Sequence, residues 1–111
     1  MILMISSQGQ DLTSPIEPRF GRCPWLIKYD TETKAVEALT NPGLHQSGGA
    51  GVAASQFVID QGAEVVISGD FGPNASNALR AGNVKMVLFD GNLNNIDDAI
   101  DTFLQGKLPV F

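Results

Sequence analysis

The sequence predicts an α/β protein with one mixed five-stranded sheet, helices packed on its faces, and the element order β-β-β-α-β-α-β-α. Two short apolar runs, 64–69 and 84–89, are separated by a helix-compatible segment, and a helix between strands implies a parallel connection. The first three strand-like runs have no helix between them, which favours an antiparallel meander. Residues 93–104 show the clearest helical spacing of apolar side chains.

The first half of the chain supplies three strands. Residues 1–6 form an apolar run of β-formers, and 25–30 with 35–40 have the pattern of a hairpin that turns at 31–34. The polar, proline-containing segment 7–22 separates the first strand from this hairpin. Loops of that length are uncommon in compact domains and are usually functional.

The second half of the chain alternates helices with strands. A loop over 41–47 leads to Gly48, where an alanine-rich helix begins and continues to about Gln61. Pro73 suits the first position of a second helix that Gly82 ends. For the third helix we expect Asn92 as the N-cap and Gly106 as the stop.

These elements imply a ribonuclease-H-like arrangement in which only the second strand runs against the other four. The chain of 111 residues has the size of a single domain, so we expect one domain over 1–111. Ligands of open α/β sheets bind beyond the carboxyl ends of strands, at the point where the strand order reverses. Here that point falls between the first and fourth strands, and the loops with the most unusual residues gather at that edge.

Composition excludes several classes of function. The net charge of −5 argues against binding to nucleic acid or to an anionic membrane surface. No apolar run reaches the roughly 18 residues that cross a bilayer, and the opening residues lack the basic region of a secretory signal. Cys23 is the only cysteine, so an internal disulfide is impossible and a cytoplasmic location is expected.

The same edge is expected to attract anions. Two glycine-rich turns open helices there, and helix N-termini present backbone N–H groups and a positive dipole end. Glycines at strand–helix turns also supply tight geometry without any ligand. With two arginines beside both turns we favour a ligand, and the predicted binding residues are Arg19, Arg22, Gly48, Gly49, Ala50, Gly51, Gly72 and Asn74.

Metal contact is a further hypothesis for this edge. Cys23 and His45 are the only soft or borderline ligands apart from methionines, and both are expected to lie on this edge of the sheet. The alternatives are an inert buried cysteine and a solvated loop histidine. Asp70 and Asp90 end two strands and would suit a divalent cation, although turn capping explains them better because the first strand adds no carboxylate.

Five short segments, in order and spacing, together resemble the dinitrogenase iron–molybdenum cofactor biosynthesis family of NifX and the NifB C-terminal region. They are Ser7-x-Gly9, Pro15 to Arg22 with its Arg19-Phe20-Gly21-Arg22, Gly48-Gly49-Ala50-Gly51-Val52, Gly72-Pro73-Asn74-Ala75 and Gly106-Lys107-Leu108. The resemblance covers essentially the whole chain. It implies a ribonuclease-H-like fold without nuclease activity, in a stand-alone member that lacks the radical-enzyme part.

The resemblance also implies a cargo. Family members bind iron–molybdenum cofactor, its iron–sulfur precursor or a molybdenum–copper–sulfide cluster, and few protein ligands take part. We therefore expect a cytoplasmic, non-catalytic carrier of a metal–sulfur cluster, with cluster-assembly or cluster-accepting proteins as partners. A homodimer would bring two Cys23 thiols to one cluster. The alternatives are a regulatory or interaction module for a small anionic metabolite and a magnesium-dependent hydrolase.

Overall fold

The computed structural model describes residues 1–89 and 91–111, and its elements confirm the predicted types and order. They are β1 (Ile2–Ser7), β2 (Trp25–Asp30), β3 (Val36–Thr40), the short 3₁₀ helix η1 (Pro42–His45), α1 (Ala50–Asp60), β4 (Val65–Ser68), α2 (Pro73–Ala81), β5 (Lys85–Leu88) and α3 (Ile96–Leu104).

The strand boundaries differ from the prediction by one residue at most, and two larger differences arise because asparagine side chains cap helices at unexpected positions. Asn41 accepts a hydrogen bond from the backbone N–H of Gly43, so the expected loop over 41–47 contains η1. Asn95, not Asn92, caps α3 by accepting from the N–H of Asp98 at 2.8 Å. Leu93 therefore precedes α3, although it packs against the same core.

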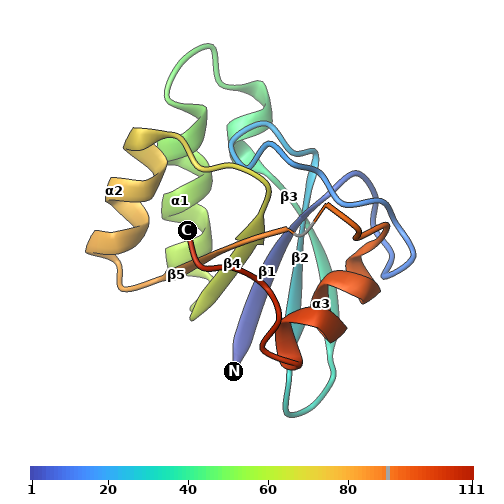
Figure 1. Ribbon diagram of the computed structural model, residues 1–111. Helices are drawn as coiled ribbons and strands as arrows, with labels where there is room; N and C mark the ends of the chain where they lie inside the picture. The colour runs from blue at the N-terminus through green and yellow to red at the C-terminus, as the bar shows by residue number, and fades with distance from the viewer. Residues whose placement is uncertain (90) are drawn as a thin grey trace.

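The sheet has the strand order β3-β2-β1-β4-β5 (Figure 1). The strand β2 runs antiparallel to the other four, which all point the same way. The register pairs Ile5 with Ile27 of β2 and with Ile67 of β4. The chain leaves β1 toward β2 and β3 and returns on the other side of β1 to form β4. The reversal of strand order thus falls between β1 and β4, as the sequence predicted.

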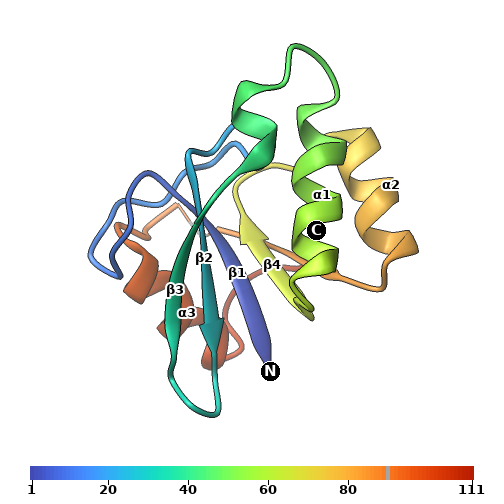
Figure 2. The ribbon, with the colours of Figure 1, turned by 180° about the vertical axis from the view of Figure 1, so that it is seen from behind.

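Two cores lie on the two faces of the sheet, with α1 and α2 covering one face and α3 the other (Figures 1 and 2). Alternation along β1 divides its side chains between them, because Met4 points to the α1 and α2 side whereas Leu3 and Ile5 point to α3. All three side chains are fully buried. This two-sided burial explains why β1 is an uninterrupted apolar run.

The two outer strands are treated differently. Residues 109–111 run along β5, where the N–H of Leu88 donates to Pro109 O at 2.8 Å and the N–H of Phe111 donates to Met86 O at 3.1 Å. At the other end of the sheet β3 is largely exposed. Over the described ranges 1–89 and 91–111, the helices are all too short or too polar to cross a membrane.

Candidate functional site

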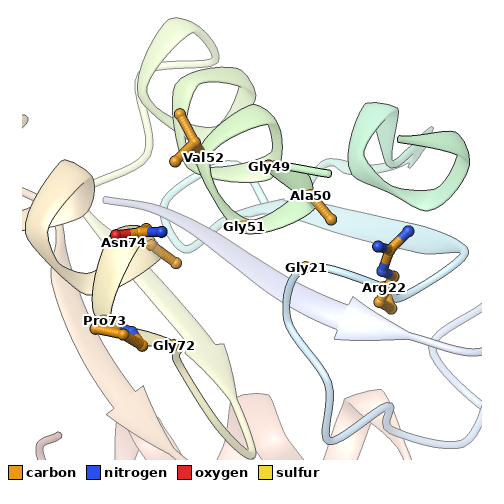
Figure 3. Close-up of a pocket in the computed structure, with 10 residues that line it drawn as sticks. Gly21, Arg22, Gly49, Ala50, Gly51, Val52, Gly72, Pro73 and Asn74 are labelled. Atoms are coloured by element: carbon orange, nitrogen blue, oxygen red, sulfur yellow. The ribbon is translucent and has the colours of Figure 1, made fainter. Parts of the chain in front are cut away.

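A pocket of about 290 Å³ lies where the first turns of α1 and α2 meet the loop that precedes β2 (Figure 3). The residues that line it share small or apolar side chains, apart from Arg22 and Asn74. They are Gly21, Arg22, Gly49, Ala50, Gly51, Val52, Gly72, Pro73, Asn74 and Ala75. The pocket is at the predicted edge of the sheet, beyond the carboxyl ends of the parallel strands.

The start of α1 forms one wall of this pocket. Gly49 is its N-cap and has a φ of +71°, a left-handed conformation that glycine adopts without strain. A glycine has no side chain to cap the helix, and no side-chain hydrogen bond caps this turn. The N–H groups of the first turn, at Ala50, Gly51 and Val52, therefore have no partner within the helix and remain available to an acceptor.

The start of α2 forms the facing wall, and it too lacks a side-chain cap. Its N-cap is Gly72, again without a side-chain cap, and Pro73 occupies the first turn with no N–H of its own. The first available donors of this helix are consequently the N–H groups of Asn74 and Ala75. Both helices direct the positive ends of their dipoles at one pocket.

Glycines let the three walls approach one another closely. A Cβ added to Gly21 would lie 3.0 Å from the backbone nitrogen of Gly51, and one added to Gly51 would lie 3.1 Å from the Cβ of Ala75. The loop, α1 and α2 are thus in contact through main chain and a single methyl group. Larger residues would separate the walls.

The two predicted arginines have different environments. Arg22 lines the pocket on the side opposite Gly72 and Asn74 (Figure 3), and its Nη1 donates to the carbonyl of Gln46 at 2.6 Å. Arg19 lies outside the lining and forms an ion pair with the buried Glu17 at 3.4 Å. The Glu17 carboxylate raises the pKa of Arg19 through this hydrogen bond and its charge. The positive charge of Arg19 is therefore already matched within the protein.

Cys23 is not brought to the pocket. Its side chain is fully buried, its thiol donates to Phe20 O at 3.2 Å, and the amide of Asn41 lies 3.4 Å from its sulfur. Burial raises the pKa of this thiol to about 12, so it stays protonated at neutral pH. Metal ligation by cysteine requires the thiolate, and this environment opposes it.

His45 and Gly48 also lie outside the pocket lining. His45 ends η1 and is exposed. Gly48 is exposed in the turn before α1, with no heavy atom within 4 Å of an added Cβ. The structure thus brings together Arg22, Gly49 and Ala50 from the predicted set, together with Gly51, Gly72 and Asn74. It leaves Arg19, Gly48, Cys23 and His45 apart from them.

Of the predicted carboxylate pair, Asp90 lies outside the described residues. Asp70 is exposed and its backbone bridges to Arg19. In the described part of the chain no three His, Cys, Asp or Glu residues are grouped so as to hold a metal ion.

The predicted binding set lacked four residues that line the pocket, namely Gly21, Val52, Pro73 and Ala75. Each is a direct neighbour of a predicted residue, so a search extended by one position along the two turns and the Arg19–Arg22 segment would have found them. Asn41, which holds the loop that carries Gly21, follows a predicted strand and gave no functional signal.

Comparison with known proteins gives consistent matches. Residues 1–106 match the family model described as dinitrogenase iron–molybdenum cofactor. The apo form of the orange protein of Desulfovibrio gigas is 31% identical to this chain and superposes with a TM-score of 0.92. The match covers 99% of this chain and 92% of the orange protein. A NifB-like protein of Thermotoga is 34% identical over 98% of this chain and 91% of its own, with a TM-score of 0.84. An uncharacterized protein of Methanocaldococcus jannaschii is 26% identical over 86% of this chain and 82% of its own length.

Proposed function

This chain belongs to the dinitrogenase iron–molybdenum cofactor family, and from that premise we propose that it carries a preassembled anionic metal–sulfur cluster and catalyses no reaction. The cargo is iron–molybdenum cofactor, its iron–sulfur precursor or a molybdenum–copper–sulfide cluster. One observation supports this most: two helix starts without side-chain caps face a single pocket whose one charged lining residue, among those described, is Arg22.

The pocket suits a soft, sulfide-rich anion better than a strongly hydrated one. Backbone N–H groups and a guanidinium donate hydrogen bonds to sulfide while the dipoles of both helices offset negative charge. Apart from Asn74, the remaining side chains of the lining are small or apolar, with Val52 exposed at the rim and Ala50 and Ala75 buried at the walls. In a protein with a formal charge of −5, the absence of acidic groups among the described lining residues favours the entry of an anion.

In this proposal the protein binds the cluster largely through non-covalent contacts. A cluster whose metals already carry sulfide ligands needs no thiolate from the protein, and the thiol of Cys23 is buried and protonated. His45, the one histidine of the sequence, is exposed at the end of η1 and can be tested as a ligand by substitution. Such a site releases its cargo to an acceptor without breaking a protein–metal bond. Cluster-assembly and cluster-accepting proteins in the cytoplasm are the proposed partners.

Anaerobic titration tests the proposal, with tetrathiomolybdate as the probe. We expect one equivalent of chromophore to stay with the protein through desalting. Replacement of Arg22 by glutamine removes the one lining charge and should weaken binding about 10- to 150-fold, because a hydrogen bond to a charged group contributes about 1.5–3 kcal/mol. Arg80→Gln, at the far end of α2, is the matched control and should bind as the wild type does.

The rival candidate is a module that binds a phosphate-bearing metabolite at the same amides. Competition separates the two, because inorganic phosphate at millimolar concentration would displace the probe only if the pocket prefers oxyanions. A chromophore lost on desalting from the wild-type protein would contradict the carrier proposal. Absence of turnover on phosphoesters with magnesium would argue against the hydrolase alternative.

A further inference from the structure

Asn41 occupies a junction between the sheet and the pocket. It follows the last residue of β3, its own N–H donates to Pro24 O at 3.2 Å, and it is the N-cap of η1. The residue is only 2% exposed although its side chain is polar. A buried amide is stable only when its donors and acceptor are satisfied, so its partners identify what it holds.

The side-chain amide of Asn41 acts in two directions. Its Oδ1 accepts from the N–H of Gly43 at 2.9 Å, which fixes the start of η1. Its Nδ2 donates to three carbonyls of the loop before β2, at 2.9 Å to Cys23 O, 3.2 Å to Gly21 O and 3.3 Å to Phe20 O. Two hydrogens thus serve three converging carbonyl oxygens.

This loop is a wall of the pocket. It carries Gly21 and Arg22, which line the cavity, and Gly21 touches the backbone of Gly51 at the start of α1. On the other side, Gly43 lies against the carbonyls of Gly21 and Ala50 so closely that an added Cβ would clash with both. Asn41 therefore stands between η1, which packs against the start of α1, and the loop, which lines the pocket.

We propose that Asn41 is the positioning residue of the binding pocket: its Nδ2 draws the carbonyls of Phe20, Gly21 and Cys23 together. It thereby sets where Gly21 and Arg22 lie against the start of α1. This inference rests on the proposed function for its binding readout and on the geometry alone for its structural readout. The side chain lies outside the pocket lining, so its effect on a ligand passes through the loop.

Two substitutions separate positioning from helix capping. Asn41→Asp keeps the shape and an oxygen that caps η1, but replaces the donor with a carboxylate oxygen that repels the three carbonyls. Asn41→Ser likewise preserves a good N-cap while losing the reach to the loop. Asn95→Asp is the control, because Asn95 also caps a helix, α3 on the opposite face of the sheet, where its Oδ1 accepts from the N–H of Asp98 at 2.8 Å.

Binding of tetrathiomolybdate to each folded variant gives the first readout. We expect the dissociation constant to rise at least about tenfold in Asn41→Asp and severalfold in Asn41→Ser, as the loss of one or two buried hydrogen bonds predicts. Asn95→Asp should stay within twofold of the wild type. Equal affinities in all four proteins would overturn the inference, since capping alone is retained in each.

Backbone amide chemical shifts give a second readout that needs no ligand. In Asn41→Ser the shifts of Gly21, Arg22 and Gly51 should move, whereas in Asn95→Asp they should not. Unchanged shifts at these amides would overturn the inference even if the probe fails to bind the wild type. Failure of the wild type to retain the probe, with the shifts moving as expected, would instead count against the proposed function.

Discussion

For single residues, burial decides the chemistry more than residue type does. The sequence offers two arginines at this edge, yet Arg19 is paired with Glu17 and only Arg22 lines the pocket. No pattern in the sequence distinguishes them, because the difference arises from the fold of the 7–22 loop against β1. Cys23 is a candidate ligand by residue type, but its complete burial in the core, with its thiol on the Phe20 carbonyl, cannot be deduced from one position beside a strand.

Because the thiol of Cys23 is buried, we expect the free energy of unfolding to fall at high pH. Burial raises its pKa from 9.0 to about 12, so above pH 9 the unfolded chain releases a proton that the folded protein retains. The unfolded state then binds fewer protons, and the free energy of unfolding falls with rising pH by about 1.4 kcal/mol per unit between these values. The stabilising contribution is fully present below pH 9.

Chemical denaturation of the wild type and of Cys23→Ala at several pH values from 8 to 10.5 checks this. The stability of the wild type should decline more steeply than that of the variant above about pH 9. Parallel pH profiles would show that the thiol ionises equally in the folded and unfolded states.

The same pair of proteins tests whether Cys23 takes part in binding. Their affinities for tetrathiomolybdate should agree within about twofold, because the proposed binding needs no thiolate. A large loss of affinity in Cys23→Ala would show that Cys23 is a ligand.

Among the elements, the helix starts were the most predictable part of the site. Glycine-rich turns before α1 and Gly72-Pro73 before α2 are local signals, and both helices begin within two residues of the predicted positions. The short helix η1 was missed because four residues give no helical periodicity, and its cap, Asn41, is equally typical of a turn. Its role depends on contacts with residues 20 positions away.

A pair of glycine variants tests whether η1 must pack tightly against α1. In Gly43→Ala the new Cβ would clash with the carbonyls of Ala50 and Gly21, so we expect a loss of about 1–3 kcal/mol and weaker probe binding. Gly48→Ala adds the same methyl group in open space and should change stability by less than about 0.5 kcal/mol. Equal denaturation midpoints would contradict the close packing of η1.

At the scale of the whole molecule, the strand order followed from connections that the sequence reveals. A meander followed by two helical crossovers leaves few arrangements, and β3-β2-β1-β4-β5 is the one observed. The sequence did not reveal that residues 109–111 cover the edge of β5. This segment lies beyond the residues that match the family model and has no strand-like alternation.

The covering segment also reaches the pocket loop through an aromatic series. The ring of Phe111 lies 5.3 Å from Phe71, which lies 5.2 Å from Phe20, and Arg80 stacks 5.9 Å from the Phe111 ring. Phe111→Ala should therefore lower the free energy of unfolding by about 1–2 kcal/mol. The more exposed Val110→Ala serves as the control and should cost less than about 0.5 kcal/mol in thermal or urea denaturation. Similar losses in the two variants would show that the aromatic contact of Phe111 does not stabilise the fold.

In the proposed function, the backbone amides at the starts of α1 and α2 hold the anionic cargo. Titration of ¹⁵N-labelled protein with tetrathiomolybdate under anaerobic conditions, followed by backbone amide chemical shifts, tests it most directly. We expect the largest shift changes at residues 50–52 and at Asn74 and Ala75, complete at one equivalent of probe. Shifts centred on Cys23 or His45, or none at saturating probe, would contradict it.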